Sequence, residues 1–503
     1  METQINPIEI KAKPIIVGEA AKGTENQVAE PTHKPIMPPK YSQPGKALDD
    51  LYRALPIVDF NNHQHVEEKG KPKISEKCVI AIDTLIEAAK KSNRNVIVID
   101  DTFRIFNGCY YERHDDSEMM KFLSAAAKRM SWNPVQSKFY ANSDKLYKQL
   151  RKMTRRERRE RSRERVLLNF PNGTLEIDRN GFQFREHRAE DLLTSCVSYE
   201  YDPQAVSPKF DAFVDEMLPD KPSQDLLFDF LAVVLLPFVK CEKVLFLHGE
   251  GRNGKSVIFE VVKKLFGESN VSNYTVEELT TDKGYCLIDI MDKLLNYGPD
   301  VELSMNTSAL KTLASGEEKM VRQIYQKQRT MRVYARQMYN TNGVFEKGFE
   351  VTDAIKARLD FIPFTVKVSE EKKDLELAQK LIAECAGIMN KVLRHVQTVL
   401  ANGGKLTDCD ASRALTEDMF SYIDSIDDFL INDNITPCGE TDIPLQQFYS
   451  DYVRYCRDFH LPVCGYNKFA SGLRKRGFEV KKVGGKARKV NAHPKSAETS
   501  EIL

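Results

Sequence analysis

The sequence lacks the marks of a membrane-spanning, secreted or zinc-stapled protein. Its 503 residues contain no apolar run near the roughly 18 residues that a membrane span requires, and the first residues have no continuous apolar stretch typical of a secretory signal. None of the ten cysteines forms a CxxC pair, which argues against a zinc ribbon and a disulfide scaffold. The net charge is only +1, so total charge identifies no partner. We therefore expect reduced thiols, an intracellular protein and no membrane partner.

The length and composition predict several globular domains. At roughly 150 residues per domain, the chain is long enough for two to four of them, and 41% hydrophobic with 29% charged residues suits folded rather than disordered protein. Seven prolines and little apolar periodicity before position 48 predict a disordered tail. The expected segments are a disordered tail at 1–47, an α+β region ending in a basic segment at 48–165, a strand pair with a buried helix at 166–239, an α/β region at 240–415, a small α+β domain at 421–491 and a tail at 492–503.

Apolar periodicity and turn residues predict the main elements. The expected helices span 79–90, 118–129, 225–239 and much of 370–415. The expected strands include 95–99, either a strand or a hairpin at 103–111 around Asn107-Gly108, and a strand–turn–strand at 166–177.

Residues 145–165 are strongly basic, with eleven Lys and Arg against three Glu. One interpretation is a solvated helix supported by Glu–Arg pairs four residues apart. The other is a surface that contacts a phosphate backbone. The sequence leaves both open.

The most specific motif is VLFLHGEGRNGKS at 244–256, a short apolar strand, a glycine loop and the start of an amphipathic helix. Glycines let backbone N–H groups turn inward around phosphate oxygens, and a helix N-terminus adds partial positive charge. This context predicts that the chain binds and hydrolyses a nucleoside triphosphate, ATP with Mg²⁺. Lys255 would contact the β- and γ-phosphates, and Ser256 would offer its hydroxyl to Mg²⁺. The expected phosphate-binding residues are Gly249, Gly251, Asn253, Gly254, Lys255 and Ser256.

Polar residues at the ends of later apolar runs are candidates for the same site. Asp300 follows the run 293–297, where a carboxylate could hold Mg²⁺ and polarise water, and Glu302 is a weaker metal candidate. The run 336–339 ends in Asn340-Thr341-Asn342, and a polar amide at such a strand tip could orient the attacking water. Arg358 precedes a further run at 360–368. Taken singly, Asp300 fits an ordinary turn and Arg358 a surface residue.

Seven motifs in this order resemble superfamily 3 helicases of the phage- and plasmid-encoded primase–helicase group, which includes the poxvirus helicase–primase. The resemblance runs from about Val166 to Val490. Its motifs are LLNFPNGTLEI, YEYDPQAVSPKFDAFVDEML, GEGRNGKS, LLNYGPDVE, LKTLASGEEKMVRQIYQKQ, QMYNTN and IKARLDFIPF.

The resemblance implies an α/β fold, an AAA+-like P-loop motor at 240–415 preceded by a pre-motor domain at 166–239. It further implies a homo-oligomer, a hexameric ring with nucleotide sites between subunits. Asn342 would be the sensor amide, Asp300 the acid that polarises water, and Arg358 an arginine finger acting on the neighbour's site. Three departures stand out: Pro299-Asp300 replaces a pair of acids, Ala357-Arg358 a pair of arginines, and Asn342-Gly-Val-Phe the usual Asn-Glu-Leu-Pro.

DNA contacts follow from the same resemblance, in two places. A hairpin after the additional motif would point basic residues into the ring's pore, and 421–491 looks like a winged-helix domain. There, Asn467 would cap a recognition helix over 468–476, and a two-residue turn at 484–485 would form the wing. The expected DNA-binding residues are Lys319, Arg322, Lys327, Arg329, Lys468, Arg474, Lys475, Lys482, Lys486 and Arg488.

No defensible primase constellation precedes the motor. Asp100-Asp101 and His114-Asp115-Asp116 suit turns, and His63-x-His65 has no partner ligands. We expect an ATP-dependent DNA helicase that unwinds single-stranded and forked DNA for replication of a phage, plasmid or other mobile element, working with a separate primase. It would act in the cytoplasm of a bacterial host or at a viral replication site. The alternative is an ATP-dependent initiator or loader that remodels origin DNA without processive unwinding.

Overall fold

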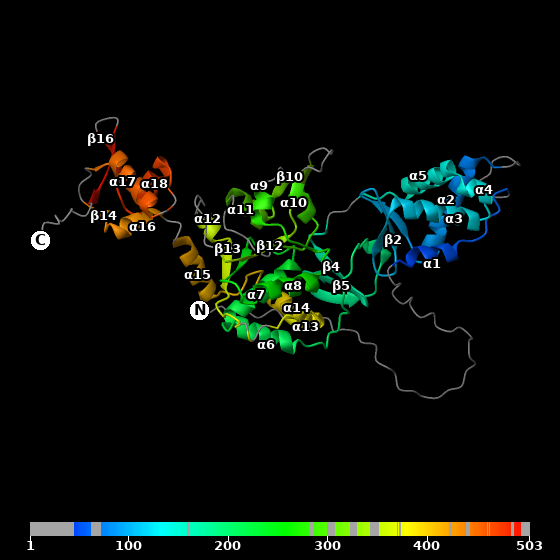
Figure 1. The fold of residues 1–503 in the computed structure, drawn as a ribbon, viewed down its shortest axis with the longest axis horizontal. Helices are drawn as coiled ribbons and strands as arrows, with labels where there is room; N and C mark the ends of the chain where they lie inside the picture. Colours follow the sequence, from blue (N-terminus) through cyan, green and yellow to red (C-terminus); the bar gives the residue numbers. More distant parts are fainter. Residues whose placement is uncertain are drawn as a thin grey trace, which may run out of the picture.

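The structure is a computed structural model that describes most of the chain after its first 44 residues. The described residues are 45–61, 72–157, 161–281, 285–298, 307–321, 329–342, 352–369, 371, 374–421, 425–438, 443–459, 461, 463–483 and 487–493. The predicted tails at 1–47 and 492–503 lie almost wholly outside them, as does His63-x-His65. Figure 1 shows three groups of elements that follow one another along the chain. In the described part, none of the helices has the length and apolarity that crossing a membrane would take.

The first group packs helices against a three-stranded antiparallel meander, β1-β2-β3. Asp100 and Asp101 both adopt positive φ, at 49° and 58°, and join the paired residues Ile99 and Thr102, so their interpretation as a turn is confirmed. The Asn107-Gly108 hairpin is confirmed, and Asp115 caps α3 through the Glu118 N–H. The elements are α1 (Ala47–Ala54), α2 (Ile74–Lys91), β1 (Val96–Ile99), β2 (Thr102–Phe106), β3 (Tyr111–His114), α3 (Asp116–Arg129), α4 (Pro134–Lys138) and α5 (Tyr140–Thr154).

The basic segment is not one helix. The α5 helix ends at Thr154, Arg155 turns extended at φ −59° and ψ 130° and forms a parallel bridge with Val98, and β4 begins at Arg165. The prediction of a single solvated helix over 145–165 is therefore wrong in its second half. The physical reason is that a run of cations three and four residues apart repels itself in a helix, while an extended chain pairs with β1.

The second group is built on a fully parallel five-stranded sheet of order β13-β7-β12-β9-β8. This confirms the predicted α/β region. Its elements are β7 (Val244–His248), α8 (Lys255–Phe266), β8 (Val271–Ser272), α9 (Val276–Thr281), α10 (Tyr285–Ile290), β9 (Leu295–Gly298), α11 (Thr307–Ser315), β10 (Glu318–Val321), β11 (Arg329–Arg332), β12 (Arg336–Thr341), α12 (Asp353–Lys356) and β13 (Leu359–Pro363).

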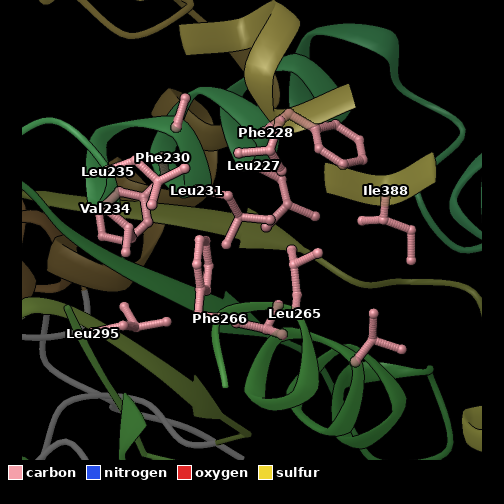
Figure 2. Close-up of a cluster of buried hydrophobic side chains, with 14 of the residues drawn as sticks. Leu227, Phe228, Phe230, Leu231, Val234, Leu235, Leu265, Phe266, Leu295 and Ile388 are labelled. Carbon is pink, nitrogen blue, oxygen red and sulfur yellow. The ribbon is translucent and has the colours of Figure 1, made fainter. Parts of the chain in front are cut away.

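One hydrophobic core joins this sheet to the residues before and after it. The predicted buried helix is α7, which starts earlier than expected because Asp220 caps it at Ser223. Figure 2 shows α7 side chains such as Phe230 and Leu231 facing Leu265 and Phe266 of α8. The surrounding elements are β4 (Arg165–Phe170), β5 (Gly173–Asp178), β6 (Gly181–Arg185), α6 (Pro208–Met217), α7 (Lys221–Val234), α13 (Leu377–Ile382), α14 (Cys385–Ala401) and α15 (Asp410–Ser421).

The third group is a small α+β unit with its own apolar cluster. Two details differ from the prediction. Gly465, not Asn467, occupies the cap position of α18, which places Asn467 inside the first turn. Val483 pairs with Ala487, so three residues rather than two connect the last hairpin. The elements are α16 (Ser425–Asn432), β14 (Thr436–Pro437), β15 (Ile443–Pro444), α17 (Leu445–Asp458), α18 (Tyr466–Lys475), β16 (Val480–Val483), β17 (Ala487–Val490) and β18 (Ala492–His493).

Replacing Gly387 by alanine is expected to destabilise the central unit. A Cβ at this α14 position would lie 2.3 Å from the carbonyl carbon and oxygen of Val206, which are backbone atoms that a rotamer change cannot move. We expect a loss of about 2 kcal/mol, although helix propensity alone would favour alanine by about 1 kcal/mol. Calorimetric unfolding of Gly387→Ala, compared with Ala386→Gly in the same helix, tests this. A rise in the unfolding temperature of Gly387→Ala would contradict the contact.

Candidate functional site

The glycine loop lies at the carboxyl end of the sheet, between β7 and α8. Gly251, Arg252 and Gly254 all adopt positive φ, at 55°, 55° and 81°. Such a run curls the backbone so that successive N–H groups turn toward one concave side. The α8 helix begins at Lys255, directly after this curl. The predicted strand–loop–helix context is therefore confirmed.

The loop is fixed by contacts with two neighbouring strands. The Gly249 N–H donates to the Thr341 carbonyl of β12 over 3.1 Å, and the Phe364 N–H after β13 donates to His248 over 2.7 Å. Asn253 is buried, and its Nδ2 donates to the Phe364 carbonyl at 3.0 Å. A Cβ on Gly249 would meet that same carbonyl at 2.3 Å. Glycine at 249 is thus required by close packing.

Lys255 and Ser256 differ in their exposure. Lys255 is 7% exposed, and its Nζ donates to the Gly249 carbonyl and, at 3.0 Å, to Asn253 Oδ1. Its charge is thus held inside the concave side of the loop. Ser256 is exposed at the first turn of α8, so its hydroxyl is open to a ligand.

The strand ends beside the loop bring one further predicted residue close. Because all five strands are parallel, their carboxyl ends meet at one edge. Asn342 is exposed directly after β12, which is the immediate neighbour of β7. The end of β9, at Gly298, lies one strand further along. Asp300 and Glu302, two residues expected there, lie outside the described residues.

Asn340, the first residue of that strand tip, is buried inside β12, whereas Asn342 is exposed. Asn340 is 1% exposed, its Oδ1 accepts from the Tyr297 hydroxyl at 2.8 Å, and its Nδ2 has no hydrogen-bond partner among the described residues. Strand alternation puts Asn340 and Asn342 on the same face of β12, and Tyr297 packs against Phe259 of α8 on that face. The β12 sequence RQMYNT holds several polar residues, so nothing in it singles out Asn340 as the one that bonds to Tyr297.

Arg358 lies at the opposite edge of the sheet. It directly precedes β13, and its carbonyl accepts from the N–H of Val244, the first residue of β7. Its guanidinium donates to Glu242 Oε2 at 2.5 Å and to the Ala354 carbonyl at 2.7 Å. A hydrogen bond from Lys240, together with the charge of Arg358, lowers the pKa of Glu242. The structure therefore does not bring Arg358 to the loop of its own chain.

A second arginine, Arg336, anchors the segment that carries Glu242. It starts β12 and donates to the carbonyls of Cys241 at 2.8 Å, Leu236 at 3.2 Å and Val239 at 2.8 Å. Burial lowers the pKa of Arg336 from its ordinary value. Three carbonyls thus hold one half-buried cation between the end of α7 and the start of β7.

The predicted DNA-binding residues fall into two places. Lys319 is on β10 and Arg329 on β11, which form the expected antiparallel hairpin, while Arg322 and Lys327 lie outside the described residues. Lys468, Arg474 and Lys475 are on α18, and Lys482 and Arg488 stand opposite each other on β16 and β17. Lys486 lies outside the described residues.

Burial and the nearby Lys255 ammonium lower the pKa of His248 from 6.5. This ring, at the end of β7, therefore stays neutral to lower pH than an exposed histidine does.

Within the described ranges, no group of three or more His, Cys, Asp or Glu side chains is arranged to hold a metal ion.

Comparison with known proteins gives two family matches. Residues 83–219 match the model "D5 N terminal like", a domain found in phage and plasmid primase–helicase proteins. Residues 247–355 match a family of unknown function, DUF5906. Among curated proteins none matches the chain.

Matches among solved structures include two of the NrS-1 C-terminal region in its apo A form. One is 12% identical with a TM-score of 0.47 and covers 81% of this chain and 97% of that one. The other is also 12% identical, with a TM-score of 0.46, and covers 81% and 98%.

The pKa of His248 gives a direct test of the Lys255 position. Only the neutral ring reacts with diethylpyrocarbonate, so we expect His248 modification, followed by mass spectrometry, to have a midpoint below pH 6.5. Lys255→Met should move the midpoint upward, because it removes a charge that disfavours the imidazolium. Lys367→Met, whose ammonium pairs with Glu250, is the control and should leave it unchanged. An unmoved midpoint in Lys255→Met would mean that Lys255 lies elsewhere.

Proposed function

We propose that this chain is an ATP-driven DNA helicase whose subunits form a ring and share each nucleotide site. The motor is a P-loop ATPase of the AAA+-like kind, and the work is the unwinding of forked DNA during replication of a phage, plasmid or other mobile element. The match of residues 83–219 to a domain of primase–helicase proteins supports the replication context. One observation carries the proposal: the loop lies at the carboxyl ends of the parallel strands, and Arg358 lies at their amino ends.

That separation supports action between subunits. The β13 strand has five residues, which at about 3.3 Å each span ~16 Å between Arg358 and the loop edge. An arginine that assists its own site would have to cross the whole sheet. A second copy that packs its Arg358 edge against the loop edge of the first satisfies both sites without any such movement. Repeated head to tail, this contact closes into a ring, for which we propose six subunits.

In this site the loop binds and the neighbour triggers hydrolysis. The curled backbone around Gly251 and Gly254 would surround the phosphates, and Lys255 would exchange its bonds to Gly249 and Asn253 for phosphate oxygens. Asn342 would orient the attacking water from the end of β12, beside Asp300. Mg²⁺, which supplies charge neutralisation when bound, would be held by the exposed Ser256 hydroxyl with Asp300 and Glu302. The neighbour's Arg358 would stabilise charge that develops in the transition state.

Two basic surfaces would hold the DNA. Lys319 of β10 and Arg329 of β11, together with Arg322 and Lys327 from the sequence between them, would line the pore. A positive groove of this kind binds single strands without sequence preference. We further propose that the C-terminal unit is a winged-helix domain with α18 as its recognition helix. On β16 and β17, Lys481 opposes Lys489 and Lys482 opposes Arg488. A hairpin with basic residues at these paired positions would suit a phosphate backbone as its partner.

Arg358→Ala should reduce the rate of ATP hydrolysis about a thousandfold and leave the affinity for nucleotide nearly unchanged. The reason is that an arginine finger acts mainly on the transition state. The matched control is Glu242→Ala, which breaks the same ion pair from its other side but keeps the guanidinium. We expect Glu242→Ala to retain hydrolysis. Steady-state ATPase assays and nucleotide titrations measure both. Equal losses in the two variants would reduce Arg358 to a structural role.

Mixing two inactive variants should restore activity if the site is shared. In a mixture of Lys255→Ala and Arg358→Ala subunits, about a quarter of the interfaces would combine an intact loop with an intact finger. We expect hydrolysis to reappear in the mixture and to be absent from each variant alone.

Strand displacement on a forked duplex is a second measurement, made on the wild-type protein. Normal DNA-stimulated hydrolysis without displacement would favour the initiator or loader function instead.

A further inference from the structure

The N-terminal unit carries an exposed aromatic pair that its own fold does not use. Phe139 and Tyr140, at the junction of α4 and α5, are 54% and 78% exposed. Their rings form an edge-to-face pair with centroids 5.1 Å apart. Exposed aromatic side chains lose the burial that stabilises most rings, so a pair of them at one corner indicates a contact made outside this chain.

The corner that presents these rings is held rigidly. Asn133 caps α4 through the N–H groups of Val135 and Gln136. Asn142, which is 3% exposed, donates through Nδ2 to the Gln136 carbonyl at 2.9 Å. Buried Trp132 donates to Gln136 Oε1 at 3.1 Å. The backbone under the rings is therefore preorganised, which lowers the entropic cost of binding.

A line of cations continues from the rings along α5. Lys145, Lys148 and Lys152 are exposed and separated by three and four residues, which puts them on one side of the helix. Exposed Arg155 and Arg156 follow. Within 138–157 there are seven Lys and Arg against two acids, Asp144 and Glu157. Of these two, Asp144 pairs with Lys148 at 2.8 Å.

We propose that this face of α4 and α5 binds single-stranded nucleic acid, with Phe139 and Tyr140 stacking on unpaired bases and the α5 lysines contacting phosphates. Stacking platforms beside a cationic track are the chemistry that single strands require, because a duplex keeps its base faces covered. An acidic protein surface would match the lysines, but it would not need two rigid rings at the end of the line. The inference extends the proposed helicase to residues outside its motor.

The test compares two variants of the full-length protein in binding to oligothymidylate as a function of salt, without nucleotide. Lys145→Ala/Lys148→Ala/Lys152→Ala should flatten the slope of log K against log salt by about 2, because each phosphate contact contributes about 0.7 for single strands. Phe139→Ala/Tyr140→Ala should weaken binding about tenfold or more at an unchanged slope. An oligouridylate titrated in parallel distinguishes DNA from RNA as the strand bound.

A control variant makes the result specific. Lys90→Ala/Lys121→Ala/Lys128→Ala removes the same charge from exposed lysines of α2 and α3 and should leave the slope unchanged. The titrations contain no nucleotide, so failure of the motor proposal would not affect this test. Photo-cross-linking with iodouracil-substituted DNA should label Phe139 or Tyr140. An unchanged salt slope in the lysine variant, or an unchanged affinity in the aromatic variant, would overturn the inference.

Discussion

The parallel register of five short strands is the constraint on which the proposed chemistry depends. Because β7 and β13 run in the same direction, whatever follows them meets at one edge and whatever precedes them meets at the other. The loop with Lys255 belongs to the first edge, and Arg358 belongs to the second. If β13 ran antiparallel to β7, Arg358 would lie at the same end of the sheet as Lys255, and no second subunit would be needed to join them. The separation therefore follows from topology and not from the position of any loop.

The ion pair between Arg358 and Glu242 holds the guanidinium in one position at the amino ends of the strands. Without a counter-charge, the Arg358 guanidinium would be held only by solvent, and its side chain would be mobile. Here Glu242 holds it, and Lys240 and Ser315 adjoin the same carboxylate. Both partners are partly exposed, at 23% and 29%, so the pair contributes little to stability and can exchange for another anion at small cost. Its value is in orientation.

Much of the central unit was predictable because glycine and apolar runs encode it locally. The motif at 244–256 specified strand, loop and helix, and the run at 336–339 specified β12. What failed was of two kinds, one that depended on a partner remote in sequence and one that was local. The helix over 145–165 broke where β1 offered Arg155 a strand partner, and the last hairpin gained a residue because Val483 pairs with Ala487. The pair between Glu242 and Arg358 spans 116 residues, and no local pattern contains it. The buried position of Asn340 could not be predicted because its partner Tyr297 is 43 residues away in the sequence.

The three carbonyl bonds of Arg336 make β12 a mechanical link across the sheet. Asn342 follows the carboxyl end of this strand, beside the loop. At the amino end, Arg336 donates hydrogen bonds to the turn that precedes Glu242. A strand cannot stretch, and its neighbours on both sides restrain it from tilting. If the proposed hydrolysis moved the Asn342 end of β12, Arg336 at the other end would carry that movement to the turn before Glu242. β12 would then link the nucleotide site of one subunit to the surface that faces the next subunit in the proposed ring.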